Sequence, residues 1–101
     1  MGVSRKFKES PLYQGTDEQI AYRLTTTPWG SSPTSPTVVI KDQNGVDVSS
    51  ACLSGIPSVS SDYITTPLVV SLVPGIKYRL EIKFNISDNI VEAWGEIWGE
   101  I

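Results

Sequence analysis

The side chains that most often carry enzyme chemistry are scarce in this sequence. The chain has no histidine and a single cysteine, Cys52. A Ser-His or Cys-His nucleophilic pair is therefore impossible, and one cysteine cannot build a structural zinc site. The glycines at Gly95 and Gly99 lack the lysine and the helix pattern that follow a phosphate-binding loop. We expect no catalytic residue, no metal and no cofactor, and we predict that the protein is not an enzyme.

Carboxylates gather at one place, near the C-terminal end of the sequence. Glu92, Glu96 and Glu100 are spaced four residues apart. Paired carboxylates in a cleft can hydrolyse glycosides, but this even spacing on a strand directs all three to one outward face. Trp94 and Trp98 share that face, so the pattern predicts a binding surface rather than a catalytic site. Its candidate interface residues are Glu92, Trp94, Glu96, Trp98 and Glu100.

This Trp/Glu stripe, residues Glu92, Trp94, Glu96, Trp98 and Glu100, has two interpretations. Tryptophan is enriched at protein contacts, so the stripe can pair with a basic surface. Arg5, Lys6 and Lys8 of a neighbouring subunit would provide such a surface. The other interpretation is that both tryptophans cover their own sheet or pack against the N-terminal arm of the same chain.

Length and composition indicate a single domain. The chain has 101 residues, of which 40% are hydrophobic and 19% charged, which suits one two-layer core. We predict a basic arm or edge strand over residues 1–12 and one folded domain over residues 13–101. The net charge of −3 argues against a nucleic-acid partner, although the arm itself is basic.

The single cysteine and the first residues predict where the chain is made. Cys52 has no partner for an intrachain disulfide, and small secreted domains usually need such crosslinks. The N-terminal residues lack the apolar core of a signal peptide, and no apolar run reaches transmembrane length. We expect assembly in a reducing cytoplasm, no membrane partner, and a buried Cys52 thiol.

Alternating apolar residues predict strands throughout and no helix. The expected strands are residues 17–26, 37–41, 46–48, 63–70 and 77–86, and a last strand from about residue 91; the residues before about Pro11 form either an arm or a short edge strand. Asn44-Gly45 is a strong hairpin signal between two of them. The Asp/Asn-rich turn lacks the closing glutamate of a calcium loop. Pro67 marks an edge strand or a bulge. About seven short strands with this turn spacing predict an all-β sandwich.

A turn followed by a tyrosine identifies one corner of this sandwich. In Leu72-Val-Pro74-Gly75-Ile-Lys-Tyr78, a Pro-Gly turn leads into a strand whose first inward residue is tyrosine. In a tyrosine corner the hydroxyl bonds to backbone just upstream. We predict that Tyr78 is buried and that its hydroxyl bonds to the backbone of the corner, whose residues are Leu72, Pro74, Gly75 and Tyr78.

The segment from Pro67 to Phe84 resembles the EF corner and F strand of Ig-like and fibronectin type III domains. From Gln14 to the C-terminus, the chain is similar to small single-domain Ig-like proteins encoded among the virion structural genes of tailed phages and prophages. The resemblance rests on Gly15-Thr-Asp-Glu, Arg23-Leu-Thr-Thr-Thr, Asn44-Gly45, Thr65-Thr-Pro-Leu and residues 72–84.

This resemblance implies an antiparallel Ig-like sandwich with no catalytic residues. It also implies a structural or assembly role in a virion, synthesis in a bacterial host cytoplasm, and contacts with itself or with other virion proteins. The tetrapeptide repeat, Trp94-Gly-Glu-Ile and Trp98-Gly-Glu-Ile, lies outside the resemblance.

The alternative function is a carbohydrate-binding or adhesion module. Trp29 lies in a loop of Ser, Thr and Pro residues, with Tyr22 near its base. The Trp29 ring either plugs the end of the sandwich or presents a stacking surface to a sugar. A sugar site requires aromatic and polar groups to converge at one end of the sandwich.

The two faces of each strand also predict the core and one register. The expected core residues are Ile20, Tyr22, Leu24, Val38, Ile40, Leu72, Leu80, Ile82, Phe84 and Ile97. In the last hairpin we favour Lys83 opposite Glu92, Arg79 opposite Glu96 and Lys77 near Trp98. The neighbouring register would set Glu81 against Glu96, a like-charge pair.

Overall fold

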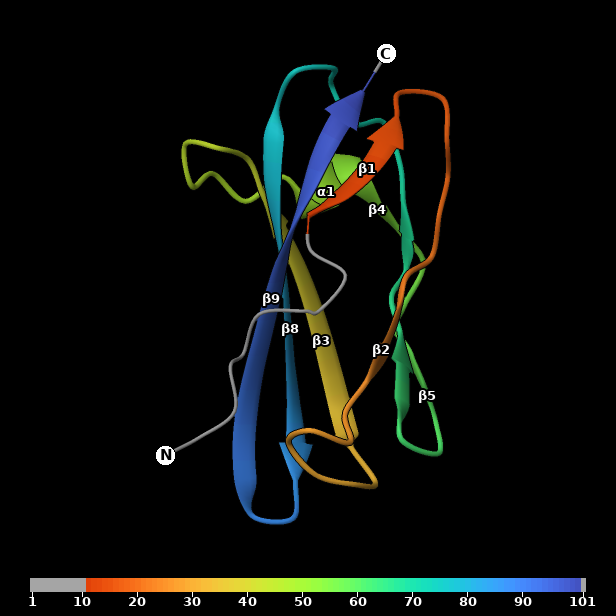
Figure 1. Cartoon of the computed structure of the whole chain (residues 1–101), viewed down its shortest axis with the longest axis vertical. Helices are drawn as coiled ribbons and strands as arrows, with labels where there is room; N and C mark the ends of the chain where they lie inside the picture. The colour runs from red at the N-terminus through yellow and green to blue at the C-terminus, as the bar shows by residue number, and fades with distance from the viewer. Residues whose placement is uncertain (1–10, 101) are drawn as a thin grey trace.

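A computed structural model of the protein describes residues 11–100, which form an all-β fold with one short helix (Figure 1). Its elements are β1 (Leu12–Gly15), β2 (Arg23–Thr25), β3 (Thr34–Lys41), α1 (Ser49–Cys52), β4 (Leu53–Ser54), β5 (Ser58–Ser60), β6 (Tyr63–Thr65), β7 (Leu68–Val69), β8 (Lys77–Ile86) and β9 (Asn89–Glu100). The predicted arm over residues 1–12 lies mostly outside the described residues, and β1 begins at its end.

The first layer is a four-stranded sheet in the order β1-β9-β8-β3. β8 and β9 form a long antiparallel hairpin whose last pair, Ile86 and Asn89, leaves a two-residue loop. Ser87, the first loop residue, has φ of 52°, and a positive φ at this position is a feature of tight hairpin turns. The short β1 runs parallel to β9 and adds to its far edge.

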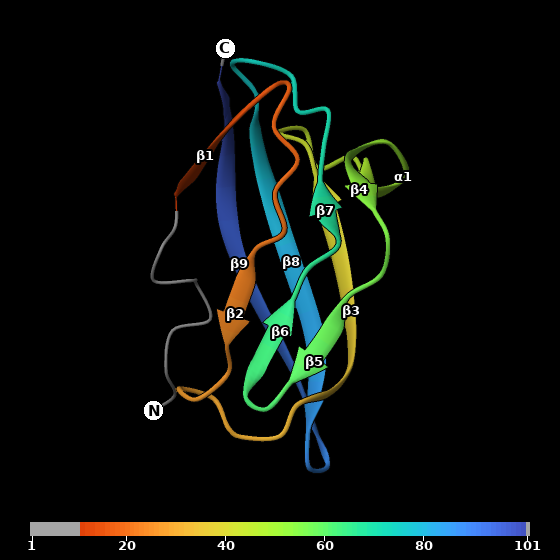
Figure 2. The same ribbon diagram turned by 90° about the vertical axis from the view of Figure 1, so that its right-hand side faces the viewer.

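The second layer consists of short strands in two small sheets, β2-β6-β5 and β4-β7 (Figure 2). Gly55 and Pro57 separate β4 from β5, and Thr66 and Pro67 separate β6 from β7. The predicted run 63–70 therefore divides at Pro67 into β6 and β7, whereas β4 and β5 lie in a segment where no strand was predicted.

The core between the layers contains most of the residues that the alternation predicted. Leu24, Ile40, Leu72, Leu80, Ile82, Phe84 and Ile97 are all buried. Ile20, Tyr22 and Val38 are only partly buried; Tyr22 and Val38 pack against this core from its border, and the prediction is wrong for Ile20. Ile20 forms an isolated bridge with Val69, and Tyr22 bonds to Thr66, so both already lie along the second layer. Val38 follows the register shift between Thr34 and Thr37 in β3.

Pro67 does not mark an edge strand, which corrects one of the two predictions for it. Its segment lies centrally in the second layer, because β6 pairs with both β2 and β5. Opposite the interruption, the Tyr22 N–H donates to the Thr66 hydroxyl at 2.9 Å. A side-chain oxygen thus replaces a regular ladder partner, and the proline is tolerated.

The helix α1 is a second departure from the sequence prediction. Its four residues are too few to show a helical period. Local polar bonds support it instead: the Ile40 N–H donates to Ser49 Oγ at 3.0 Å, and the Ser49 N–H donates to Asp47 Oδ1 at 2.9 Å. Hydrogen bonds from the Ser49 side chain and backbone N–H lower the pKa of the Asp47 carboxyl.

The Asn44-Gly45 turn forms as predicted, but the predicted strand 46–48 is reduced to a single bridge between Lys41 and Asp47. Gly45 has φ of 82°, which disfavours any side chain there. Asp42 Oδ1 accepts the N–H groups of Asn44 and Val46 at 2.9 and 3.0 Å. The turn therefore closes through a carboxylate as well as through the backbone.

Candidate functional site

The outward face of the four-stranded sheet carries the candidate interface residues. The burial of β9 alternates along its length, so its odd-numbered residues from Val91 to Gly99 face the core. All five residues of the Trp/Glu stripe point outward: Glu92 and Glu100 are exposed, and Trp94, Glu96 and Trp98 are half-buried. The structure therefore brings the predicted residues together on one face.

The register of the β8–β9 hairpin is the one favoured from the sequence. Lys83 lies opposite Glu92, Arg79 opposite Glu96, and Lys77 opposite Trp98. Cross-strand neighbours of opposite charge contribute about 0.2–1 kcal/mol each. The cations of β8 thus lie beside glutamates of the stripe and offset part of their negative charge.

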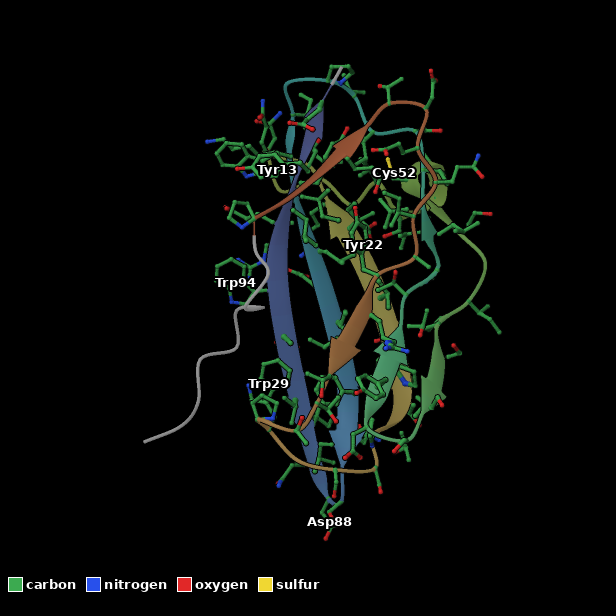
Figure 3. The ribbon with its side chains drawn as sticks, turned by 45° about the vertical axis from the view of Figure 1, so that its right-hand side comes forward. Tyr13, Tyr22, Trp29, Cys52, Asp88 and Trp94 are labelled. Carbon is green, nitrogen blue, oxygen red and sulfur yellow. The ribbon has the colours of Figure 1, made fainter. Side chains whose placement is uncertain are left out.

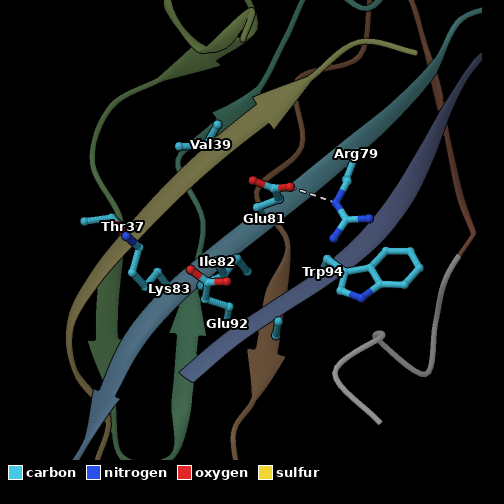
Figure 4. Close-up of a pocket in the computed structure, with 9 residues that line it drawn as sticks. Thr37, Val39, Arg79, Glu81, Ile82, Lys83, Glu92 and Trp94 are labelled. Atoms are coloured by element: carbon cyan, nitrogen blue, oxygen red, sulfur yellow. Dashed lines mark hydrogen bonds and ion pairs between the residues drawn. The ribbon is translucent and has the colours of Figure 1, made fainter. Parts of the chain in front are cut away.

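Trp94 lies beneath a charged side chain that is itself held in place (Figure 4). The Arg79 guanidinium lies 4.3 Å from the centre of the Trp94 ring. Glu81 fixes it through an ion pair of 2.7 Å with Arg79 Nε, and it also pairs with Lys41 Nζ at 3.4 Å. A cation therefore covers one face of this aromatic ring, which stabilises the cation by about 0.5–1 kcal/mol at an exposed site.

Two shallow hollows adjoin on this face. One has a volume of about 260 Å³ and lies between Thr37 and Val39 of β3 and Glu92 and Trp94 of β9. The other, of about 330 Å³, extends to the Asp42–Gly45 turn. Arg79 and Trp94 line both. Their mixed charges suit a polar peptide surface better than a small ligand of one charge.

Trp98 is covered from two sides. The Tyr13 ring of β1 meets it edge-on with centroids 5.6 Å apart, and Lys77 Nζ lies 4.5 Å from its ring centre. Within the described chain its indole Nε1 is buried and has no hydrogen-bond acceptor, which typically costs about 1–3 kcal/mol. Trp98 is thus largely a packing residue, as one of the two interpretations held.

The predicted tyrosine corner is present. Tyr78 is 4% exposed, and its hydroxyl accepts the Val73 N–H at 2.9 Å. Of the other corner residues, Leu72 is buried, Pro74 is exposed, and Gly75 has φ of 85°. Both predictions for Tyr78 are therefore confirmed.

Gly99 is a structural residue that the sequence did not identify. The Gly75 N–H donates to the Gly99 carbonyl at 3.0 Å, and the Gly99 N–H donates to the Ile76 carbonyl at 2.9 Å. A Cβ atom at Gly99 would collide with the Val73 carbonyl oxygen. The corner thus folds directly onto β9, and the only sequence signal is an inward-facing glycine, which Gly99 shares with Gly95.

Gln14 is the second residue that sequence reasoning missed. Its side chain is fully buried. Its Nε2 donates to the carbonyls of Val69 at 2.7 Å and Glu18 at 3.0 Å, and its Oε1 accepts the Tyr22 hydroxyl at 2.7 Å. Burial, with the charge of Glu18, raises the pKa of Tyr22 to about 12. This network ties β1 to the second layer.

The residues of the carbohydrate alternative are not brought together. Trp29 and Tyr22 lie at different levels along the molecule (Figure 3). The Trp29 ring lies 6.1 Å from the Phe84 ring and packs against the core, as the first of its two interpretations expects. The Tyr22 hydroxyl is bound to Gln14. Cys52 is buried as expected, and this burial raises the pKa of its thiol.

No profile of a known protein family matches the chain, and no similar sequence is found among curated proteins. Over residues 11–100, no helix has the length and apolar character needed to cross a membrane. In the same range, no group of three or more acidic or cysteine side chains is arranged to hold a metal ion.

Proposed function

We propose that the protein is a non-catalytic structural or assembly component of a tailed-phage or prophage virion, built as an Ig-like sandwich. It acts through protein–protein contacts made by the Trp/Glu stripe. The observation that carries this proposal is the position of the stripe. Two tryptophans and three glutamates share the outward face of β9, next to an edge that β1 covers only in part.

The strand order supports the Ig-like assignment. The β1-β9-β8-β3 sheet faces a layer containing β2-β6-β5, with β1 parallel to the last strand. The Tyr78 corner precedes the penultimate strand, as in the EF corner of such domains. An outward-facing, partly exposed stripe on such a scaffold offers contact area without any reactive group.

The carbohydrate-binding alternative has less support. Sugars stack on open aromatic faces, whereas Arg79 and Lys77 cover one face of Trp94 and Trp98 respectively. The loop with Trp29 does not converge with Tyr22. Neither observation favours a sugar site.

Purified virions test the proposed function. If a prophage encodes this chain, particles induced from that host contain it in a fixed ratio to a coat or tail protein, measured by quantitative mass spectrometry. Deleting the gene should reduce the yield of infectious particles. Particles that lack the protein and form normally without it would contradict the proposal. Capsid, portal or tail genes beside the coding sequence are the corresponding genomic evidence.

A further inference from the structure

The turn that follows β3 contains the one Asn-Gly pair of the sequence. Asn44 precedes Gly45, whereas Asn85 and Asn89 each precede an isoleucine. Asn44 and Gly45 are both exposed. Within the described chain, no atom except those of its neighbours lies within 4 Å of where a Cβ on Gly45 would stand. The turn, which lies between β3 and α1 in Figure 1, is therefore open to solvent.

An Asn-Gly pair of this kind can modify itself, because asparagine is a chemically labile residue. The Gly45 amide loses its proton to a base in the solvent, and its nitrogen attacks Asn44 Cγ. A new N–Cγ bond forms, and the Cγ–Nδ2 bond breaks to release ammonia, which takes its third proton from water. Water then opens the five-membered imide at one of its two C–N bonds. The net reaction consumes one water and releases one ammonia.

The two ways of opening the imide give two products. Breaking the new bond to Cγ leaves aspartate in an ordinary backbone. Breaking the original backbone bond leaves isoaspartate, in which the chain continues through Cγ and is longer by one carbon. Either product carries a carboxylate where the neutral amide of Asn44 stood, so the modification adds one negative charge.

The residue after each asparagine decides which of the three reacts fastest. Gly45 has no side chain, so Asn44 Cγ can approach the attacking nitrogen freely. The β-branched isoleucines that follow Asn85 and Asn89 crowd the same approach. Asn89 is exposed, as Asn44 is, and it also adjoins a tight turn. It therefore provides a control matched in exposure within the same molecule.

The folded turn opposes this reaction through Asp42. The Gly45 N–H, which carries the proton that must leave, donates to the Asp42 carbonyl at 3.0 Å. The N–H groups of Asn44 and Val46 donate to Asp42 Oδ1 at 2.9 and 3.0 Å. Attack requires the first of these bonds to break, and the other two hold the backbone on either side of the reacting nitrogen. The charge of the carboxylate also disfavours a second anion beside it.

We propose that Asn44 is a deamidation site of this protein and that Asp42 slows the reaction in the folded state. The inference goes beyond the proposed virion role and does not depend on it. Asp42 is a positioning residue in this scheme, because it acts through the N–H groups of the turn.

Conversion of Asn44 changes one border of the outward face of the sheet. Asp42, Gln43 and Gly45 line the larger of the two hollows there, and Gln43 Oε1 accepts the Lys77 N–H at 3.4 Å. A backbone longer by one carbon cannot keep all three bonds to Asp42. The isoaspartate product therefore opens the turn and places a new negative charge on this border.

Incubation of the full-length protein at mildly alkaline pH tests the site. Mass spectrometry of proteolytic peptides follows the increase of about one dalton that deamidation causes, and an isoaspartate methyltransferase assay detects the second product. We expect conversion at Asn44 in folded wild type, no change at Asn85 and Asn89 over the same time, and faster conversion at Asn44 when the chain is unfolded in urea. Asn44→Gln removes the signal, because its longer side chain would have to close a six-membered ring.

Two variants test the role of Asp42. Asp42→Ala removes the side-chain acceptor and should speed conversion about fivefold, the factor that corresponds to one hydrogen bond. Asp42→Asn is the matched control, since it retains an oxygen that can accept the same N–H groups and should stay within about twofold of wild type. Urea midpoints check that both variants are folded. The comparison of folded with unfolded wild type needs no variant.

Three results overturn the proposal. Asn44 that is unchanged in folded wild type, after the unfolded chain has converted, is not a site of the native protein. Equal rates in the folded and unfolded chain show that the turn gives no protection. Equal rates in wild type and Asp42→Ala, or equally high rates in Asp42→Ala and Asp42→Asn, show that the hydrogen bonds to the Asp42 side chain do not control the reaction.

Discussion

The tetrapeptide Trp-Gly-Glu-Ile occurs twice in succession in the last strand, and its two copies have different surroundings. In the first copy, Trp94 lies under Arg79 beside the two outward hollows. In the second, Trp98 is covered by Tyr13 and Lys77, and the corner backbone packs onto Gly99. The period of four keeps each residue type on one face of the strand, so their local geometry is the same.

The difference arises from segments far away in the sequence. β1 pairs with the second copy along its edge, and the Leu72–Gly75 corner covers its inward side. Neither segment reaches Trp94. The second copy therefore holds the fold together, and the first is the part of the stripe that we propose for contact. Four predictions test this division, from the largest expected effect to the smallest.

Gly99→Ala should cost about 3 kcal/mol of unfolding free energy, because its Cβ would overlap the Val73 carbonyl and backbone must move. Gly15→Ala, in the paired strand β1, is the matched control. Its added Cβ would meet only the Glu18 side chain at ordinary distances of 3.4 Å or more, so we expect a change within about 0.5 kcal/mol. Urea unfolding measures both, and equal costs would show that the corner does not press on the second copy.

Trp98→Ala should destabilise the monomer by about 2–3 kcal/mol, because it removes a packed ring beneath Tyr13. Trp94→Ala should cost about 1 kcal/mol, mainly its contact with Arg79. Self-association, in contrast, should weaken more when Trp94 is replaced than when Trp98 is replaced. Sedimentation of Trp94→Ser beside Trp98→Ser, at concentrations where both are folded, measures this. A Trp94 variant that is the less stable of the two would reverse the assignment of roles.

Tyr78→Phe should lower the unfolding free energy by about 1–2 kcal/mol, because the Val73 N–H loses its acceptor at the corner. The exposed Tyr63 is the control, since Tyr63→Phe retains the ring over which Arg23 lies. If Tyr78→Phe unfolds at the midpoint of wild type, this hydroxyl does not stabilise the corner over the second copy.

The Tyr22 hydroxyl, which bonds to Gln14 of β1, should make the stability of the protein depend on pH. The pKa of Tyr22 is about 12 in the folded protein, above the ordinary value of about 10. As the pH rises from about 10 to 12, the unfolded state ionises first, so stability falls across this interval and is unaffected below it. Urea midpoints at pH 9 and 11.5 should differ less in Tyr22→Phe than in wild type. An equal loss in both would show that Tyr22 is not buried against Gln14.

Local pattern was sufficient for the hairpin and the corner because both depend on residues near each other in sequence. The alternation in residues 77–86 predicted β8, and charge pairing predicted the register that places Lys83 opposite Glu92. The Pro-Gly spacing predicted the bond between Tyr78 and the corner. The pattern failed for residues whose contacts are distant in the sequence. It predicted Ile20 and Tyr22 in the core and did not identify Gln14 or Gly99.

The sequence by itself determined which residues share a face. Strand period and charge placed Trp94, Trp98 and three glutamates outward and set the inward row of β8 and β9, because these follow from the alternation of one backbone. Only the tertiary structure decided which tryptophan is covered. Coverage depends on where β1 and the corner come to rest, and those positions are fixed by long-range bonds such as those of Gln14 to Val69 and Gly75 to Gly99.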